Sequence, residues 1–284
     1  MKNTFFCKKN TINVQGKIIS LQEQWVMGIL NVTPDSFYDG GAHNSIQTAI
    51  AQTEKLLNEG AQIIDVGGYS TRPNADDIAL QEEINRVVPV IAALKQKFPN
   101  IIISIDTFRA EVARQAIQHG AAMINDISAG ELDPTMFETV AALQVPYILM
   151  HNRGTPQNMQ NQTDYTNMMD EIITFFSTKI NKLKALGVND LIIDPGFGFA
   201  KTLDQNYELL QKLSYFNVLE LPILVGLSRK SMVYKLLQTT AAEALNGTTV
   251  LHTLALEQGA SILRVHDVKE AVETIILVNK FMKS

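Results

Sequence analysis

Eight short apolar segments recur along the 284-residue sequence, and a segment with helical periodicity follows each of them. Apolar runs rich in β-branched residues suit strands that are buried on both faces, as in a parallel sheet. The strand candidates lie near 26–30, 63–66, 101–105, 123–127, 147–150, 191–194, 223–226 and 262–265. Alternation of strand and helix, repeated eight times over about 250 residues, predicts an α/β fold of the (β/α)8 TIM-barrel type. An open doubly wound sheet is the alternative, but such sheets seldom hold eight units this regular.

The helical segments between these strands have marked ends. Glycine follows the last periodic residue of several of them, which is the usual stop signal of an α-helix. We expect helices at 45–59, 82–98, 110–119, 134–143, 168–186, 205–213, 231–258 and 268–282, with 231–258 divided into two. Weak alternation over 3–22, with Asn10 and Gly16 as turn residues, predicts an N-terminal β-hairpin that closes one end of the barrel. No linker marks a second domain, so we expect a single domain over 1–284, with the hairpin in 1–22 and the barrel in 23–284.

Composition narrows the class of protein and the compartment. With 46% hydrophobic and 19% charged residues, the chain has enough apolar surface for one sizeable core. It has no apolar run of the ~18 residues that a membrane helix needs, and no secretory signal follows Met1. Cys7 is the only cysteine, which excludes an internal disulfide and favours the reducing cytoplasm. The net charge of −5 argues against nucleic-acid binding, so any phosphate site must be basic only locally.

The segment 191–201 combines a buried strand with a carboxylate at its end. Asp194 follows three aliphatic residues, and Pro195 and Gly196 stop the strand directly after it. A carboxylate at the end of a buried strand is costly unless a partner binds it. The glycines on either side of Phe197 let the backbone approach a flat ligand closely. The pattern favours a site for a flat heterocycle with polar edges, and a simple turn cap at Asp194 is the alternative.

Polar side chains follow almost every predicted strand, and in a barrel these strand ends meet at one mouth. One group consists of short side chains rich in acceptors, which suit a ring that presents N–H and amino donors. Its members are Asp106, Asn125 and Asp194. The other group consists of donors that suit a phosphate or pyrophosphate. Its members are Ser70, Thr71, Arg72, Arg264 and His266, and Lys230 could serve either group.

Several longer motifs carry these residues in a recognisable order. They read Met27-Gly-Ile-Leu-Asn-Val-Thr-Pro-Asp-Ser-Phe37, Ile64-Asp-Val-Gly-Gly-Tyr-Ser-Thr-Arg-Pro73, Ser104-Ile-Asp-Thr107, Asn125-Asp-Ile127, Asp194-Pro-Gly-Phe-Gly-Phe199, Gly226-Leu-Ser-Arg-Lys-Ser231 and Arg264-Val-His-Asp267. In these motifs the chain resembles the dihydropteroate synthase family of pterin-binding enzymes, the folate-pathway enzymes that sulfonamides target. The resemblance spans residues 27–267, nearly the whole chain, in the order of the family.

The resemblance implies a reaction and a set of roles. The family joins 6-hydroxymethyl-7,8-dihydropterin pyrophosphate to p-aminobenzoate with Mg²⁺, giving 7,8-dihydropteroate and pyrophosphate. The positions that match its pterin pocket are Asp106, Asn125, Met150, Asp194 and Lys230. Asn31 matches the metal ligand, and the pyrophosphate site corresponds to Arg72, Arg264 and His266. The aminobenzoate site corresponds to Thr71, Pro73, Phe199 and Ser231, with Phe37 closing over it and Asp35 on the first loop.

Two residues depart from the family, and two other functions stay open. Tyr69 stands where many members have Glu, and Ala200 replaces a common Gly, which is tolerated if its φ is negative. A pterin-binding methyltransferase would share the pterin carboxylates but needs no pyrophosphate site. A non-catalytic paralogue would keep the fold, with or without pterin binding, but would not catalyse the reaction. The family is usually dimeric, so the resemblance also implies a homodimer, although the apolar residues of 268–282 could simply face the barrel.

Overall fold

The computed structural model describes residues 9–33, 41–70 and 77–284, with the backbone alone at 41–45. Its centre is a ring of eight parallel strands in the order β8-β7-β6-β5-β4-β3-β10-β9. The strands are β3 (Trp25–Asn31), β4 (Ile63–Gly67), β5 (Ile102–Asp106), β6 (Met123–Asp126), β7 (Tyr147–Met150), β8 (Leu191–Asp194), β9 (Leu224–Val225) and β10 (Ile262–Val265). A parallel bridge between Ile193 and Ile223 joins β8 to the segment that enters β9, which closes the ring. The predicted TIM barrel is confirmed.

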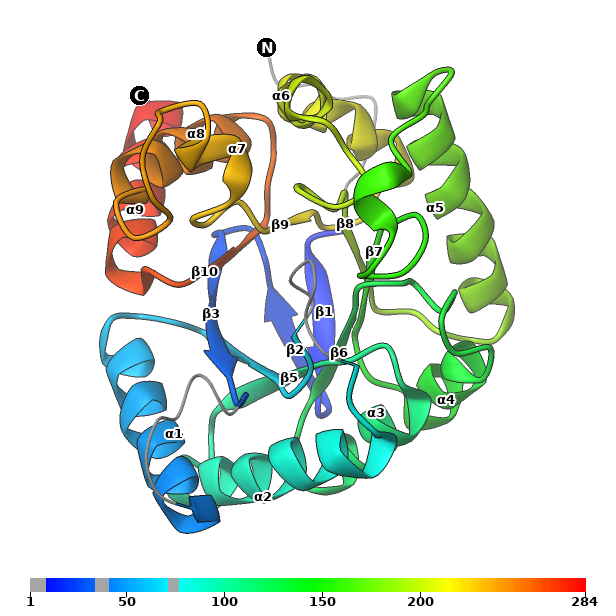
Figure 1. Ribbon diagram of the computed structural model, residues 1–284, viewed down its shortest axis with the longest axis vertical. Coiled ribbons are helices and arrows are strands. Elements are labelled where there is room, and N and C mark those ends of the chain that lie inside the picture. Colours follow the sequence, from blue (N-terminus) through cyan, green and yellow to red (C-terminus); the bar gives the residue numbers. More distant parts are fainter. Residues whose placement is uncertain (1–8, 34–40, 71–76) are drawn as a thin grey trace.

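Helices surround the strands, as the ribbon in Figure 1 shows. They are α1 (Gly41–Asn58), α2 (Leu80–Lys97), α3 (Ala110–Gln118), α4 (Met136–Leu143), α5 (Met168–Ala185), α6 (Leu203–Gln211), α7 (Ser231–Tyr234), α8 (Leu245–Glu257) and α9 (Val268–Lys283), with 3-10 turns η2 (Met159–Asn161) and η3 (Leu213–Leu219). Each longer helix buries one apolar stripe against the strands, as α5 does with Met169, Ile172, Phe176 and Leu183. The segment predicted as two helices is indeed divided, into α7 and α8.

Strand side chains alternate between the helices outside and the barrel interior. Two successive residues of β8 illustrate this, because Ile193 belongs to the outer core while Ile192 belongs to a separate inner cluster. The inner cluster fills the lower half of the barrel with Met27, Ile63, Met123, Ile148, Ile192, Leu224 and Ile262. Side chains two or four residues further along each strand also face the interior, and they lie in the upper half of the barrel, where the strands end.

A two-stranded hairpin covers the lower end of the barrel. Its strands β1 (Thr11–Val14) and β2 (Lys17–Ser20) pair antiparallel. Ile12 and Val14, with Leu21 after the hairpin, pack into the inner cluster of the barrel. The turn consists of Gln15 and Gly16, both at positive φ, as a tight two-residue hairpin turn requires. The predicted hairpin is thus present, with Gly16 in the turn, while Asn10 precedes the first strand.

The weakest strand is β9, where the prediction of a strand over 223–226 is too long. Pro222 has no N–H to give to a ladder, and Gly226 follows directly after the two paired residues. The short strand still places the segment that follows it at the mouth beside β10, with which it is paired. In the described part of the chain, no helix is both long enough and apolar enough to cross a membrane.

Candidate active site

Four residues on neighbouring strands form one lateral row at the mouth of the barrel. Asn31 lies opposite Gly67, Gly67 opposite Asp106, and Asp106 opposite Asn125. Residues that are paired in register point to the same face of a sheet, so all four face the interior at one height. Register therefore brings together two predicted pterin ligands, Asp106 and Asn125, and the predicted metal ligand Asn31.

Gly67 leaves a gap within this row. A Cβ atom at this position would lie 3.6 Å from Oδ2 of Asp106 and 3.7 Å from Oδ1 of Asn31. The missing side chain thus keeps open a space that two oxygen-bearing side chains border. Oxygen donors of this kind suit Mg²⁺, which commonly takes only one or two protein ligands together with phosphate oxygens and water. Among the described residues there is no cluster of three or more His, Cys, Asp or Glu side chains that could hold a metal by themselves.

Arg264 reaches from β10 across the interior and joins two carboxylates. Its Nε donates to Oδ2 of Asp65 and its Nη2 to Oδ2 of Asp106, each at 2.6 Å. Asn125 donates to the same Asp65 oxygen at 2.9 Å. Asp65 is fully buried, and among the described residues its second oxygen, Oδ1, has no hydrogen-bond partner. The predicted pyrophosphate ligand Arg264 therefore lies directly against the predicted pterin acceptors Asp106 and Asn125.

The charges of this network hold one another in place. Burial lowers the pKa of Arg264, but the carboxylates of Asp65 and Asp106 more than offset it, and the net pKa is raised. Burial likewise raises the pKa of Asp106, against the opposing effect of Arg264. A guanidinium that stays charged between two carboxylates is a rigid support, because removing the guanidinium leaves both carboxylates without this cation, and removing one carboxylate leaves the guanidinium with a single carboxylate partner.

Asp194 stands at the end of β8, opposite Met150 at the end of β7. Its side chain is buried, and its Oδ1 accepts a hydrogen bond of 2.8 Å from the amide of Gly196. Burial raises the pKa of Asp194, while the positive charge of Lys230 and the Gly196 amide act in the opposite direction. The predicted buried carboxylate beside glycines is therefore present, and the turn-cap alternative describes one of its contacts.

Lys230 lies between the 196–199 loop and the mouth. Its Nζ donates to the carbonyl of Phe197 and lies 4.6 Å from the centre of the Phe199 ring. Burial lowers the pKa of Lys230 to about 8, with Asp194 opposing this shift and Arg264 adding to it. A cation above an aromatic ring and near a carboxylate offers both charge and a flat surface to a heterocycle.

Two further predicted site residues, His266 and Ser231, lie after β10 and β9. His266 is exposed, and its Nδ1 lies 3.1 Å from Oγ of Ser228, which also accepts from the His266 amide. Ser231 is the first residue of α7, directly after Lys230. Arg229 is engaged by Asp267 through two hydrogen bonds, so this nearby cation is already paired with a carboxylate of the protein.

Five predicted site residues lie outside the described residues: Asp35, Phe37, Thr71, Arg72 and Pro73. The described residues beside the second of these segments are tied together. The hydroxyl of Tyr69 donates to Asp77 at 3.2 Å and accepts from Gln157 at 3.3 Å. Arg109 lies 5.4 Å from the centre of the Tyr69 ring. The tyrosine that departs from the family thus joins the segments after β4, β5 and β7.

Sequence reasoning missed some residues and one backbone conformation. Asp65 could have been found, because it stands two residues before Gly67 and so faces the interior of the same strand. The buried contact between Lys201 and His151 carries no local signal, since 50 residues separate the two. Ala200 has a φ of +47°, so the condition under which it would be a harmless substitute for Gly, a negative φ, is not met.

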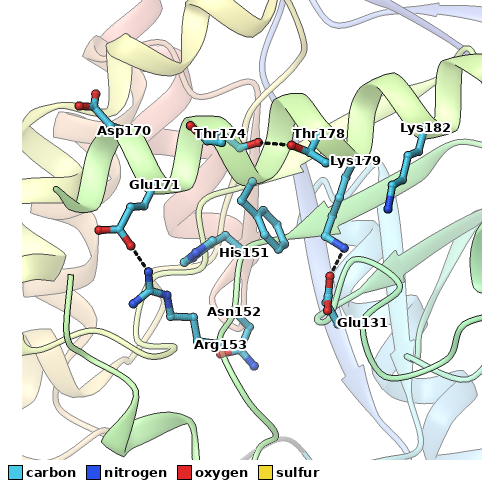
Figure 2. Close-up of a pocket in the computed structure, with 11 residues that line it drawn as sticks. Glu131, His151, Asn152, Arg153, Asp170, Glu171, Thr174, Thr178, Lys179 and Lys182 are labelled. Atoms are coloured by element: carbon cyan, nitrogen blue, oxygen red, sulfur yellow. Dashed lines mark hydrogen bonds and ion pairs between the residues drawn. The ribbon is translucent and has the colours of Figure 1, made fainter. Parts of the chain in front are cut away.

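A separate open pocket of about 490 Å³ lies beside α5, and Figure 2 shows it. Ion pairs bound it, Arg153 with Glu171 at one end and Lys179 with Glu131 at the other. None of the predicted ligands lines this pocket, but His151 does, directly after β7. The converging polar groups of the barrel mouth, and not this hollow, therefore make the candidate active site.

Comparisons with known proteins show the family to which the chain belongs. The family model described as pterin binding enzyme matches residues 27–266. Dihydropteroate synthase of Synechocystis sp. is 50% identical over 86% of each chain, and that of Escherichia coli K12 is 45% identical over 93% of this chain and 94% of its own. The solved structure of the Yersinia pestis dihydropteroate synthase with a sulfonamide drug complex superposes with a TM-score of 0.90, at 44% identity over 96% of this chain and all of that one. The chain belongs to the pterin-binding enzymes and, among them, to the dihydropteroate synthases of folate biosynthesis.

Proposed function

We propose that this chain condenses 6-hydroxymethyl-7,8-dihydropterin pyrophosphate with p-aminobenzoate to give 7,8-dihydropteroate and pyrophosphate. The observation that carries the proposal is the convergence of Asp106, Asn125 and Asp194 at one barrel mouth, with Lys230 held over Phe199. Three acceptor-bearing side chains at fixed positions match the donor-rich edge of a pterin. Met150 and Phe199 supply apolar surface for its faces.

Arg264 has a double role in this proposal. Its contacts with Asp65 and Asp106 hold the acceptor Asp106 in place, and His266 follows it by two residues, directly after β10. Side chains two residues apart along an extended segment point the same way, so both can face the same part of the mouth. We assign Arg264, His266 and Arg72 to the pyrophosphate, whose charge grows as it departs.

We assign Mg²⁺ as the cofactor, held by Asn31 next to the gap at Gly67. When bound there, the ion would supply positive charge to the pyrophosphate oxygens. The fit rests on the oxygen of Asn31, which lies at the same height as Asp106. Calorimetry should detect Mg²⁺-dependent binding of pyrophosphate, and Asn31→Ala should weaken that dependence without abolishing binding of the unphosphorylated pterin.

The reaction itself asks little covalent help from the protein. The bond between the pterin CH₂ carbon and the pyrophosphate oxygen breaks, and the amine nitrogen of p-aminobenzoate forms the new bond and loses one proton. A neutral arylamine is already a nucleophile, so positioning and charge neutralisation carry the catalysis. We assign the aminobenzoate site to Thr71, Pro73, Phe199 and Ser231, with Phe37 and Asp35 on the first loop.

Two solved relatives support this second site. One is the Xanthomonas albilineans dihydropteroate synthase with 4-aminobenzoic acid, which is 38% identical to this chain with a TM-score of 0.90 over 97% of this chain and 99% of its own. The other is the Yersinia pestis structure with a sulfonamide drug complex. We propose that sulfonamides compete with p-aminobenzoate in this chain too. We place the reaction in the cytoplasm, because Cys7 is the only cysteine.

We further propose that the chain forms a homodimer through α8 and α9, which pack against each other. Large apolar side chains on these two helices are between 43% and 71% exposed: Val250, Leu254, Ile276, Leu277 and Phe281. Exposed apolar surface of this kind usually marks an interface. Light scattering should give the mass of a dimer, and Leu277→Glu with Phe281→Glu should give a monomer, while Leu186→Glu at the end of α5 should change nothing.

An assay of released pyrophosphate tests the main proposal. With the pterin pyrophosphate and Mg²⁺ present, release should depend on added p-aminobenzoate, and Asp194→Asn should abolish it. A chain that binds the pterin but releases no pyrophosphate under any condition would be a non-catalytic paralogue. Transfer of a methyl group from a methyl-tetrahydropterin, without pyrophosphate release, would identify a methyltransferase instead.

A further inference from the structure

Lys201 is a buried lysine whose hydrogen bonds go to backbone carbonyls and one histidine. Lys201 is only 4% exposed and lies two positions before Leu203, the first residue of α6. The Nζ atom donates to the carbonyl oxygens of Gly196 and Phe199, each at 3.0 Å, and lies 3.1 Å from Nδ1 of His151. An ammonium group has three donors, so these three partners satisfy all of them. The lysine is therefore fully hydrogen-bonded within the protein, and is not a free group that waits for a ligand.

His151 is suited to accept the third of these hydrogen bonds. It is 2% exposed, and burial holds its pKa well below the ordinary value, with the positive charges of Lys201 and Arg153 acting in the same direction. The ring is therefore neutral and can offer Nδ1 as an acceptor. Phe175 packs against the ring edge-on at 4.9 Å, which fixes its orientation. His151 directly follows β7, and Figure 2 shows its ring beside α5.

The loop from Gly196 to Ala200 has an unusual backbone that depends on such partners. Gly196, Gly198 and Ala200 all have positive φ, so successive carbonyl groups turn in different directions. Each carbonyl from Gly196 to Ala200 accepts a hydrogen bond from a side chain. Lys201 binds Gly196 and Phe199, Lys230 binds Phe197, Gln160 binds Gly198, and Tyr165 binds Ala200. Of these four donors, Lys201 is the one that holds two of the carbonyls.

This loop also contacts the Asp194 carboxylate, through the 2.8 Å hydrogen bond from the amide of Gly196. Burial raises the pKa of this carboxyl, and three cations oppose that rise without cancelling it. Lys230 comes from the segment before α7, Arg264 from β10 and Lys201 from the segment before α6. Burial lowers the pKa of Lys201 itself to about 7, with Asp194 opposing that shift. Lys201 is therefore charged over the acidic range in which a carboxyl group titrates.

We propose that Lys201 is a positioning residue for the pterin, which holds the Gly196–Phe199 loop and keeps Asp194 an ionised, correctly placed acceptor. The proposal rests on the assignment of Asp194 to the pterin. Lys230 and Lys201 then have different roles. Lys230 faces the mouth and can touch the ligand, while Lys201 acts on Asp194 from the protein side.

The test compares Lys201→Met and Lys201→Arg with the unaltered protein by calorimetry, using 6-hydroxymethyl-7,8-dihydropterin as the probe over a range of pH. Met matches the length of Lys but removes the charge and all three hydrogen bonds. We expect a loss of affinity of about ten- to a hundredfold, as for buried acceptors that lose their donor. As the pH is lowered, pterin affinity should fall when Asp194 becomes protonated, and we call this part of the profile the acid limb. In Lys201→Met the acid limb should lie at least about 0.5 pH units higher, because Asp194 has lost a neighbouring cation.

The pH dependence separates this role from simple support of the fold. A lysine that only stabilised the fold would lower the affinity equally at every pH, or leave it unchanged. Lys201→Arg keeps the charge and should retain the acid limb of the unaltered protein. Lys184→Met, at an exposed position of α5, is the matched control and should change neither quantity.

His151 provides a second route if Lys201→Met does not fold. His151→Leu removes one of the three hydrogen-bond acceptors of Lys201 and should move the acid limb to higher pH, as in Lys201→Met. His151→Gln supplies a carbonyl oxygen as a replacement acceptor and should move the acid limb less. Unchanged affinity and pH dependence in Lys201→Met, or in both His151 variants, would overturn the proposal. Asp194→Asn separates the role of Lys201 from the assignment of Asp194. Unchanged pterin affinity in Asp194→Asn would refute the assignment of Asp194 to the pterin.

Discussion

Gly196→Ala offers the sharpest test of how the pterin loop is built. A Cβ atom at this position would lie 2.0 Å from the backbone oxygen of His151 and 3.1 Å from its carbonyl carbon. Carbon and oxygen that are not bonded cannot approach so closely, and the obstacle is backbone, which cannot rotate away as a side chain can. The φ of Gly196 is +74°, which an L-residue adopts only at a cost.

The expected magnitude has two parts. An alanine at positive φ costs about 1–2 kcal/mol. Forcing an extra methyl group against fixed neighbours costs about 1–3 kcal/mol more. Gly187→Ala isolates the first part, because Gly187 has a φ of +83° and a Cβ there would meet nothing within 4 Å. We therefore expect a loss of about 1–2 kcal/mol in the free energy of unfolding for Gly187→Ala and of about 2–5 kcal/mol for Gly196→Ala.

Urea unfolding of the two variants measures these free energies, and calorimetry with a pterin measures the effect on the site. Because Gly196 donates its amide to Asp194, a displaced loop should weaken pterin binding in Gly196→Ala and leave it unchanged in Gly187→Ala. Equal destabilisation by the two variants, together with full pterin affinity in Gly196→Ala, would refute the claim that the His151 carbonyl leaves no room for a side chain at position 196.

Three further predictions concern charges and buried hydrogen bonds. Burial lowers the pKa of Lys230 to about 8, so the ammonium form is lost as the pH rises through that value; pterin affinity measured by calorimetry should fall there, and a flat profile up to about pH 10 would contradict it. Tyr147→Phe removes the 2.7 Å hydrogen bond to the buried Asp126 and should cost about 1–3 kcal/mol in urea unfolding with kcat/KM unchanged, since both residues face away from the mouth. Asp65→Ala leaves Arg264 with one carboxylate and should lower the free energy of unfolding, measured with urea, by about 3–5 kcal/mol. A loss below about 1 kcal/mol would show that the ion pair between Arg264 and Asp65 does not stabilise the fold.

Much of the architecture could be predicted from local patterns. Short apolar runs alternating with helical periods predict eight β/α units, and all eight strands are present. The polar residues that follow the strands, such as Asp106, Asn125 and Asp194, do gather at one mouth, because parallel strands in a closed barrel all end on the same side. These predictions succeed because the spacing of residues along one element decides which face each side chain occupies.

The partners of those side chains depended on the tertiary structure. Arg264 was expected beside a pyrophosphate, and the fold brings it against Asp65, which lies 199 residues away in the sequence. The contact of Lys201 with His151 and the φ of Ala200 likewise had no local signal. Periodicity places a residue on a face, but only the register of neighbouring strands and the course of the loops bring two distant groups within hydrogen-bond distance. Burial then decides which of these groups can keep a charge, because a charge removed from water is stable only where the fold supplies a partner.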